Sequence, residues 1–300
     1  MSAAIFAFPE MLAQAEALGR RCAVPVHPVG VRQFPDGESL ITAPAHGAHT
    51  ALLLRSLDDP NAKLVELLLA SAALRDGGVR RVILIAPYLA YMRQDMAFHP
   101  GEAVSQRVIG GLLAQWFDGV VTVDPHLHRI ERLDQAIPGI PALALSAAPA
   151  LVAALAKELD PATVLVGPDS ESRPWVESIA APLGLHVLVG EKVRHGDRAV
   201  TLELPGISAV RDRPALLVDD VISSGTTLIA CADLLRAAGA SGIEAVATHA
   251  LASPADMARM AAAGISRIRA TDATTHPAAT IPLARVLDDA IRAAGWLETP

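Results

Sequence analysis

Two adjacent carboxylates and a loop of small polar residues form the segment of this sequence that is best suited to chemistry. Asp219 and Asp220 directly follow the apolar run 215–218, and a serine-, glycine- and threonine-containing loop then leads into a helical pattern. Backbone N–H groups at the start of a helix, with hydroxyls beside them, bind anions readily. Carboxylates suit the diol of a ribose, or a magnesium ion beside a phosphate. The segment predicts a phosphate site with carboxylates for a ribose diol or a magnesium ion, formed by Asp219, Asp220, Ser223, Ser224, Gly225, Thr226 and Thr227. The structural alternative is a turn at the aspartates and a serine that caps the helix.

Lys192 and Arg194 form a second candidate group, with one residue between two cations. On an extended segment the two side chains point the same way, because side chains alternate with a period of two. Two cations so placed could stabilise negative charge on a phosphoryl group in transfer. The alternative is a solvated strand, and the position of the pair between Asp169 and Asp219 favours the functional interpretation.

Three polar groups in the first half could also serve a ligand. His126 follows the apolar run 120–123 and could bind a metal, or could simply face solvent. The pair Arg93-Gln94 follows a Pro-Tyr-containing segment and could contact a ligand or form an exposed turn. The pair Asp36-Gly37 could do the same or form the turn of a β-hairpin.

The composition limits the class of protein. Of the 300 residues 52% are hydrophobic and 19% charged, which excludes a disordered or collagen-like chain. The net charge of -7 and the 3% of aromatic residues argue against a nucleic-acid-binding surface. Two cysteines are too few for a disulfide framework, and neither a signal peptide nor a membrane-spanning run is recognisable. We therefore expect a protein of the cytoplasm with neither a nucleic-acid nor a membrane partner.

Short apolar runs alternate with amphipathic helical patterns along both halves of the chain. This alternation predicts βαβ units, and hence an α/β fold of two similar domains, each a mainly parallel sheet flanked by helices. A Pro-Gly-Ile-Pro cluster precedes the expected boundary. The expected domains are 1–142 and 143–285, with a terminal helix in 286–300 that packs on the first domain.

The order of these segments resembles a known family. The loop after Asp220 resembles the phosphoribosyl pyrophosphate-binding loop of type I phosphoribosyltransferases, which alone leaves open whether the compound is consumed or made. The first half resembles ribose-phosphate pyrophosphokinases in the order and spacing of its motifs, and the resemblance extends from about Phe34 to Leu287. The segments that carry it are 34–38 (FPDGE), 86–95 (APYLAYMRQD), 100–105 (PGEAVS), 121–126 (VTVDPH) and 191–194 (EKVR).

The resemblance implies transfer of the β,γ-diphosphoryl group of ATP to the anomeric hydroxyl of ribose 5-phosphate, with Mg²⁺ as cofactor and AMP released. It also implies two phosphoribosyltransferase-like domains and a homo-oligomer, a dimer or hexamer, with an ATP site shared between subunits. In the implied roles Lys192 and Arg194 are catalytic, and His126 and Asp169 bind magnesium. ATP is bound by Phe34, Asp36, Gly37, Glu38, Arg93 and Gln94, and ribose 5-phosphate by Asp219, Asp220 and the loop Ser223–Thr227.

Two segments depart from the family's pattern. The family often has an acidic residue where this chain has Ser223, and it usually has glycines where this chain has 170–172 (SES). Glu171 would bring a negative charge near the diphosphate unless its side chain points away. Two other functions therefore stay open: a catalytically silent regulatory relative, and a phosphoribosyltransferase that consumes phosphoribosyl pyrophosphate.

Overall fold

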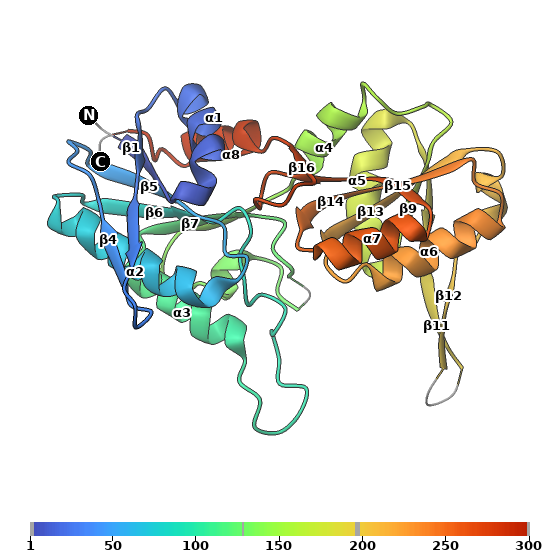
Figure 1. Ribbon diagram of the computed structural model, residues 1–300, viewed down its shortest axis with the longest axis horizontal. Helices are drawn as coiled ribbons and strands as arrows, with labels where there is room; N and C mark the ends of the chain where they lie inside the picture. The colour runs from blue at the N-terminus through green and yellow to red at the C-terminus, as the bar shows by residue number, and fades with distance from the viewer. Residues whose placement is uncertain (1–2, 128, 196–198, 299–300) are drawn as a thin grey trace. The chain divides into compact units, whose positions relative to one another are not determined.

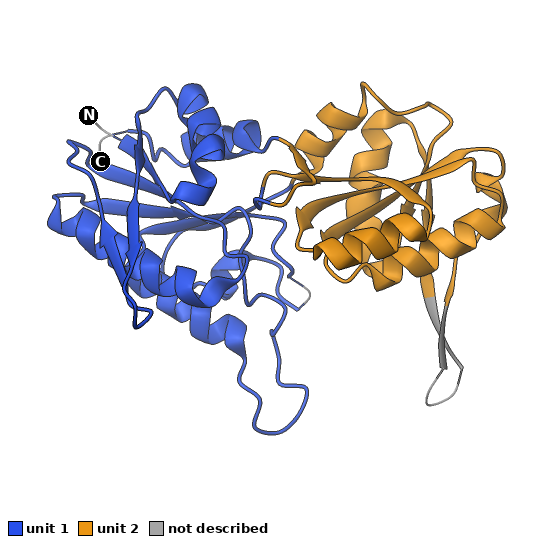
Figure 2. Ribbon diagram, in the orientation of Figure 1, with its two compact units in different colours: residues 1–146, 273–275, 282–300 blue, residues 147–272, 276–281 orange. Residues whose placement is uncertain are grey.

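The computed structural model describes residues 3–127, 129–195 and 199–298, and it describes no side chain within 192–201. The chain forms two compact units (Figure 2). Unit 1 comprises residues 1–146, 273–275 and 282–300, and unit 2 comprises residues 147–272 and 276–281. The domain boundaries at 142/143 and 285/286 stay a prediction. In the described ranges no helix combines the length and the apolar character needed to cross a membrane.

Unit 1 is built on a parallel sheet of six strands in the order β2-β1-β5-β6-β7-β8. β1, β5 and β7 are buried along their whole length, as expected for a parallel sheet that helices cover on both faces. Figure 1 shows α1 and α8 on one face, where they pack against each other, and α2 and α3 on the other. The bounds are β1 Ala3–Ala7, α1 Leu12–Cys22, β2 Val26–Pro28, β5 Thr50–Leu54, α2 Pro60–Asp76, β6 Arg81–Ile85, α3 Ser105–Trp116, β7 Gly119–Val123, β8 Ala142–Leu145 and α8 Ala284–Ala293.

Unit 2 repeats this architecture with the strand order β10-β9-β13-β14-β15-β16, also parallel throughout. Helices α4 and α5 contact each other, and so do α6 and α7 (Figure 1). The bounds are α4 Ala148–Leu155, β9 Val164–Gly167, α5 Arg173–Leu183, β10 His186–Val189, β13 Pro214–Ile222, α6 Thr226–Ala237, β14 Gly242–Ala250, α7 Pro254–Ala262, β15 Ile265–Thr271 and β16 Ala279–Ile281. Short 3-10 turns lie at η1 Pro9–Met11, η2 Leu133–Gln135, η3 Ser170–Ser172 and η4 Ile207–Val210.

Each unit also carries an antiparallel hairpin, which lies in the sequence between the first two strands of its sheet and the remaining four. In unit 1 the hairpin is formed by β3 (Gly30–Gln33) and β4 (Ser39–Thr42), and in unit 2 by β11 (Glu191–His195) and β12 (Ala199–Glu203). The two units therefore share both the strand order and the place of the hairpin. This confirms the prediction of an α/β fold with two similar domains, each a mainly parallel sheet flanked by helices.

Candidate functional site

The predicted sugar-phosphate residues lie in unit 2, where the strand order of the sheet reverses. Ligands of doubly wound sheets bind beyond the carboxyl ends of the strands at such a point. Here the reversal lies between β9, which ends at Gly167, and β13. β13 pairs with β9 only through the segment Ala215–Leu217 and continues to Ile222, so Asp219 and Asp220 extend past the end of β9. The strand expected at 215–218 thus continues four residues further, to Ile222, because β14 pairs with it as far as Ala250.

The carboxylates at this edge concentrate negative charge. The backbone N–H of Asp220 donates to Oδ1 of Asp219 at 3.0 Å. Burial raises the pKa of Asp219 to about 8, and the negative charges of Asp220 and, to a smaller extent, Asp169 act in the same direction. A ligand that brings hydroxyl donors or a cation would relieve this repulsion, as the diol of a ribose or a divalent metal would.

The loop that follows is shaped by a glycine. Gly225 is the N-cap of α6 and adopts the left-handed conformation, with φ of +71°. A Cβ atom at this position would lie 2.4 Å from Sδ of the buried Met260, so no larger residue fits without displacing it. The exposed hydroxyls of Ser224 and Thr226 lie 3.2 Å apart beside the first turn of α6. The loop therefore presents hydroxyls and helix N–H groups together, which suits a phosphate.

The segment after β9 forms a 3-10 turn instead of a glycine-rich loop. Asp169 caps η3, since its Oδ1 accepts from the backbone N–H of Ser172 at 3.3 Å, while the Ser172 hydroxyl donates to the Asp169 carbonyl at 2.6 Å. Gly167 also packs tightly here, because a Cβ would lie 2.3 Å from the Ser172 hydroxyl oxygen. The Glu171 side chain is exposed on this turn. The structure thus accommodates the departure from glycine, with the carboxylate of Asp169 serving as a cap.

In unit 1 the segment 34–38 forms the turn of the β3–β4 hairpin. The Phe34 N–H donates to the Glu38 carbonyl at 2.7 Å, and the Gly37 N–H donates to the Phe34 carbonyl at 2.9 Å. Gly37 has φ of +93°, a backbone conformation that favours glycine. The guanidinium of Arg32 lies 5.3 Å from the centre of the half-buried Phe34 ring. Asp36 and Glu38 are exposed at the tip, so the turn is compatible with a ligand contact.

The other predicted residues of unit 1 follow two neighbouring strands, β6 and β7, at the same edge of the sheet. Arg93 is exposed in the long loop after β6, and the side chain of Gln94 donates to the Met96 carbonyl at 3.1 Å. His126 is half-buried and follows β7 by three residues. The parallel sheet thus begins the loops that carry these residues at one edge of unit 1, and their roles stay a prediction.

The predicted catalytic residues Lys192 and Arg194 lie on β11, where their backbones pair with Leu202 and Val200 of β12. Their side chains lie outside the described residues, so their catalytic roles stay a prediction. The hairpin follows β10, which neighbours β9 in the sheet of unit 2.

Magnesium suits the carboxylates of unit 2 in chemical type. Within the described residues, no group of three or more His, Cys, Asp or Glu side chains could by itself hold a metal ion. Magnesium is commonly held by only one or two carboxylates together with substrate phosphates and water. Burial, and then the charges of Asp220 and Asp169, raise the pKa of Asp219, and a bound cation would lower this pKa.

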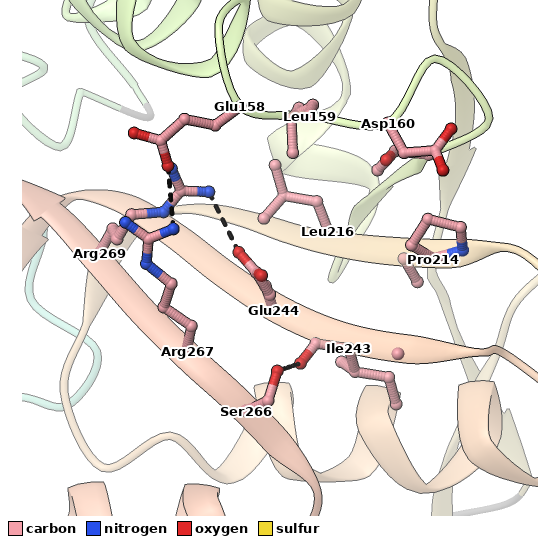
Figure 3. Close-up of a pocket in the computed structure, with 13 residues that line it drawn as sticks. Glu158, Leu159, Asp160, Pro214, Leu216, Ile243, Glu244, Ser266, Arg267 and Arg269 are labelled. Carbon is pink, nitrogen blue, oxygen red and sulfur yellow. Dashed lines mark hydrogen bonds and ion pairs between the residues drawn. The ribbon is translucent and has the colours of Figure 1, made fainter.

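A pocket at the opposite edge of the same sheet contains none of the predicted residues. It lies near the starts of β13, β14 and β15 (Figure 3). Asp219, in contrast, lies near the end of β13. Its cations pair with its carboxylates: Arg267 and Arg269 contact Glu158 at 2.9 and 3.1 Å, and Arg269 contacts Glu244 at 3.2 Å. The residues suited to phosphate chemistry therefore lie at the other edge, by Asp219.

Comparison with known proteins identifies the family. The model of the N-terminal domain of ribose phosphate pyrophosphokinase matches residues 3–116, and the model of the phosphoribosyl transferase domain matches residues 143–276. The ribose-phosphate pyrophosphokinase of Methanopyrus kandleri is 34% identical over 281 residues, which are 91% of this chain and 94% of the relative. That of Halobacterium salinarum strain R1 is 33% identical over 263 residues, 86% and 89% of the two chains.

A solved structure agrees with these matches over nearly the full length. The crystal structure of phosphoribosylpyrophosphate synthetase from Mycobacterium smegmatis aligns with a TM-score of 0.81 and 25% identity, and the alignment covers 98% of this chain and 99% of that one. Both compact units, and not just the phosphoribosyltransferase-like unit 2, are therefore shared with a synthetase. On these grounds the chain belongs to the ribose-phosphate pyrophosphokinase family.

Proposed function

We propose that this chain transfers the β,γ-diphosphoryl group of ATP to the anomeric hydroxyl of ribose 5-phosphate, giving phosphoribosyl pyrophosphate and AMP. The observation that carries the proposal is the edge of unit 2 at Asp219. There two carboxylates lie near the end of β13, and a loop of hydroxyls and the N-terminus of α6 follow this strand. Carboxylates can accept hydrogen bonds from the ribose diol, and the loop can bind the 5-phosphate.

The remaining roles follow from the family membership. Phe34, Asp36, Gly37 and Glu38 on the β3–β4 turn, with Arg93 and Gln94, would bind ATP, and Lys192 and Arg194 would act on the transferring group. Phosphoryl transfer depends mainly on alignment and charge neutralisation, which suits a pair of cations. We assign magnesium to His126 and Asp169; when bound, it would neutralise charge on the ATP phosphates. A homo-oligomer with a shared ATP site completes the proposal.

The two alternative functions have less support. A phosphoribosyltransferase needs no counterpart of unit 1, yet the N-terminal family model matches residues 3–116. A silent regulatory relative would be free to lose site residues, whereas Lys192, Arg194, His126, Asp169 and Asp219 are all retained.

The decisive experiment is the assay of the purified chain with ATP, magnesium and ribose 5-phosphate, followed by chromatography of the nucleotides. We expect AMP and phosphoribosyl pyrophosphate in equal amounts, and no AMP when the sugar phosphate is left out. A parallel reaction supplies phosphoribosyl pyrophosphate and a nucleobase. Pyrophosphate release in that reaction alone would identify a phosphoribosyltransferase, and no product in either reaction from folded protein would favour the silent relative.

A further inference from the structure

The β3–β4 hairpin of unit 1 has a weak apolar attachment to the unit that carries it. β3 and β4 pair with each other as a separate two-stranded sheet, and β3 is exposed along its whole length. On β4, Ile41 packs against the core of unit 1, whereas Leu40 is 41% exposed. A hairpin of two strands is marginally stable by itself, so its orientation depends on what holds its inner face.

A polar contact joins this hairpin to α2. The Ser39 hydroxyl donates to Oε1 of Glu66 at 2.7 Å, and β4 runs against α2 (Figure 1). Ser39 directly follows Glu38, the last residue of the turn. The contact therefore acts at the base of the turn, one residue from the side chains that the proposed function assigns to ATP.

Glu66 is itself fixed by a buried ion pair. It is 8% exposed on the face of α2 that otherwise buries Leu64 and Leu67. Its second oxygen, Oε2, accepts from Arg55 at 2.6 Å, and Arg55 also contacts Glu10 at 2.8 Å. The guanidinium of Arg55 lies 3.7 Å from the centre of the Phe8 ring, which limits its movement.

The carboxylate of Glu66 is better explained by a role in positioning the hairpin than by a contribution to the stability of the fold. Apolar residues of similar size are often as stabilising as a buried ion pair, or more so, because desolvation of the charges is costly. Glu66, however, uses one oxygen for Arg55, at the end of β5, and the other for Ser39 on the hairpin. The Arg55–Glu66 pair, with Glu66 on α2, thus holds the hairpin in a fixed position relative to the central sheet.

We infer that Ser39 and Glu66 are positioning residues that hold the β3–β4 hairpin, and with it the 34–38 turn, in the orientation that binds the adenine nucleotide. The inference rests on the proposed function for the identity of the nucleotide. The anchoring of the hairpin itself rests on the contacts above.

The test is the substitution Ser39→Ala, which removes the contact to the hairpin and leaves the Arg55–Glu66 pair in place. We expect the KM for ATP to rise roughly tenfold, the equivalent of one hydrogen bond to a charged group, while the KM for ribose 5-phosphate stays unchanged. Ser39→Thr keeps the hydroxyl and should retain the wild-type KM. Thr42→Ala removes an exposed hydroxyl from the other face of the same strand and is the matched control.

Hydrogen–deuterium exchange without ligand supplies a measurement that does not depend on activity. Ser39→Ala should speed exchange in the peptide 29–43 and leave that of α2 unchanged. Unchanged exchange in that peptide would overturn the anchoring. An unchanged KM for ATP, or equal increases for both substrates, would overturn the positioning role. If the wild-type chain forms no AMP, the proposed function fails, and ATP affinity measured by calorimetry then replaces the KM in judging the variants.

Discussion

Gly225 offers the sharpest test of how the sugar-phosphate loop is held. The substitution Gly225→Ala places a Cβ in a left-handed conformation, which costs about 1–2 kcal/mol for a residue other than glycine. It also places that atom 2.4 Å from Sδ and 2.7 Å from Cγ of Met260. Ordinary contacts between such atoms are about 3.5–4.0 Å, so Met260 must move by roughly 1 Å within a filled core. Overpacking of this kind costs about 1–3 kcal/mol.

The expected loss in the free energy of unfolding is therefore about 2–5 kcal/mol, measured by urea titration. Gly184→Ala is the matched control, because Gly184 has a similar φ of +64° and nothing lies within 4 Å of the position its Cβ would take. The control should lose only the backbone part, about 1–2 kcal/mol. Equal losses in the two variants would refute the claim that Met260 constrains the loop.

A double-mutant cycle with Met260→Ala separates the clash from the backbone strain. Met260→Ala alone leaves a cavity and should cost about 2–5 kcal/mol. In the double variant the clash is absent, so the combined loss should fall short of additivity by about 1–3 kcal/mol. If the loop binds ribose 5-phosphate, the KM for this substrate should rise in Gly225→Ala and recover in the less stable double variant. If the KM for ribose 5-phosphate is instead highest in the least stable variant, the assignment of the loop to this substrate is refuted.

Three further outcomes are expected. The pKa of Asp219 is about 8 in the folded protein and about 3.9 in the unfolded chain. Between these pH values the folded protein therefore holds a proton that the unfolded chain has released. The stability of the wild type consequently falls as the pH rises from about 4 to about 8. Asp219→Asn should therefore gain melting temperature over the wild type progressively from pH 5 to pH 9, and parallel curves would contradict this. Burial and the neighbouring Asp288 raise the pKa of Cys22 to about 12, so iodoacetamide at pH 8.5 should label Cys22 only after unfolding, as mass spectrometry of the peptides would show. Lys192→Ala should lower the rate of AMP formation about 100- to 1,000-fold with ATP still bound, whereas the exposed Lys157→Ala should keep the wild-type rate.

Several strands were predictable because Val, Leu and Ile dominate them. Apolar runs at 50–55, 119–123 and 186–189 coincide with β5, β7 and β10 to within one residue. Alanine-rich elements do not stand out from the rest of the sequence by their hydrophobicity, because 52% of all residues in the chain are hydrophobic. The strand β1 (AAIFA) and the helix α4 (APALVAAL) were not expected for this reason.

The candidate site divides in the same way. Asp219 and the loop after it were recognisable because an apolar run, two carboxylates and small polar residues are contiguous. The contact of Ser39 with Glu66 joins residues 27 positions apart and depends on how the hairpin lies on α2, so no local pattern could show it. One signal was present, namely a glutamate at a position of α2 where the helical period places apolar residues.

The repeated topology of the two units allows the charges at their equivalent edges to be compared. In unit 1 the strand order reverses between β1 and β5, and there the guanidinium of Arg55 lies over the Phe8 ring and pairs with both Glu10 and Glu66. In unit 2 the same position, between β9 and β13, holds Asp219, whose pKa is raised first by burial and then by the like charges of Asp220 and Asp169. The fold supplies an equivalent edge in both units, but the charge balance differs. In the proposed function it is the carboxylates at Asp219, and not the fold, that suit the edge of unit 2 to a ribose diol, since function belongs to sites and not to folds.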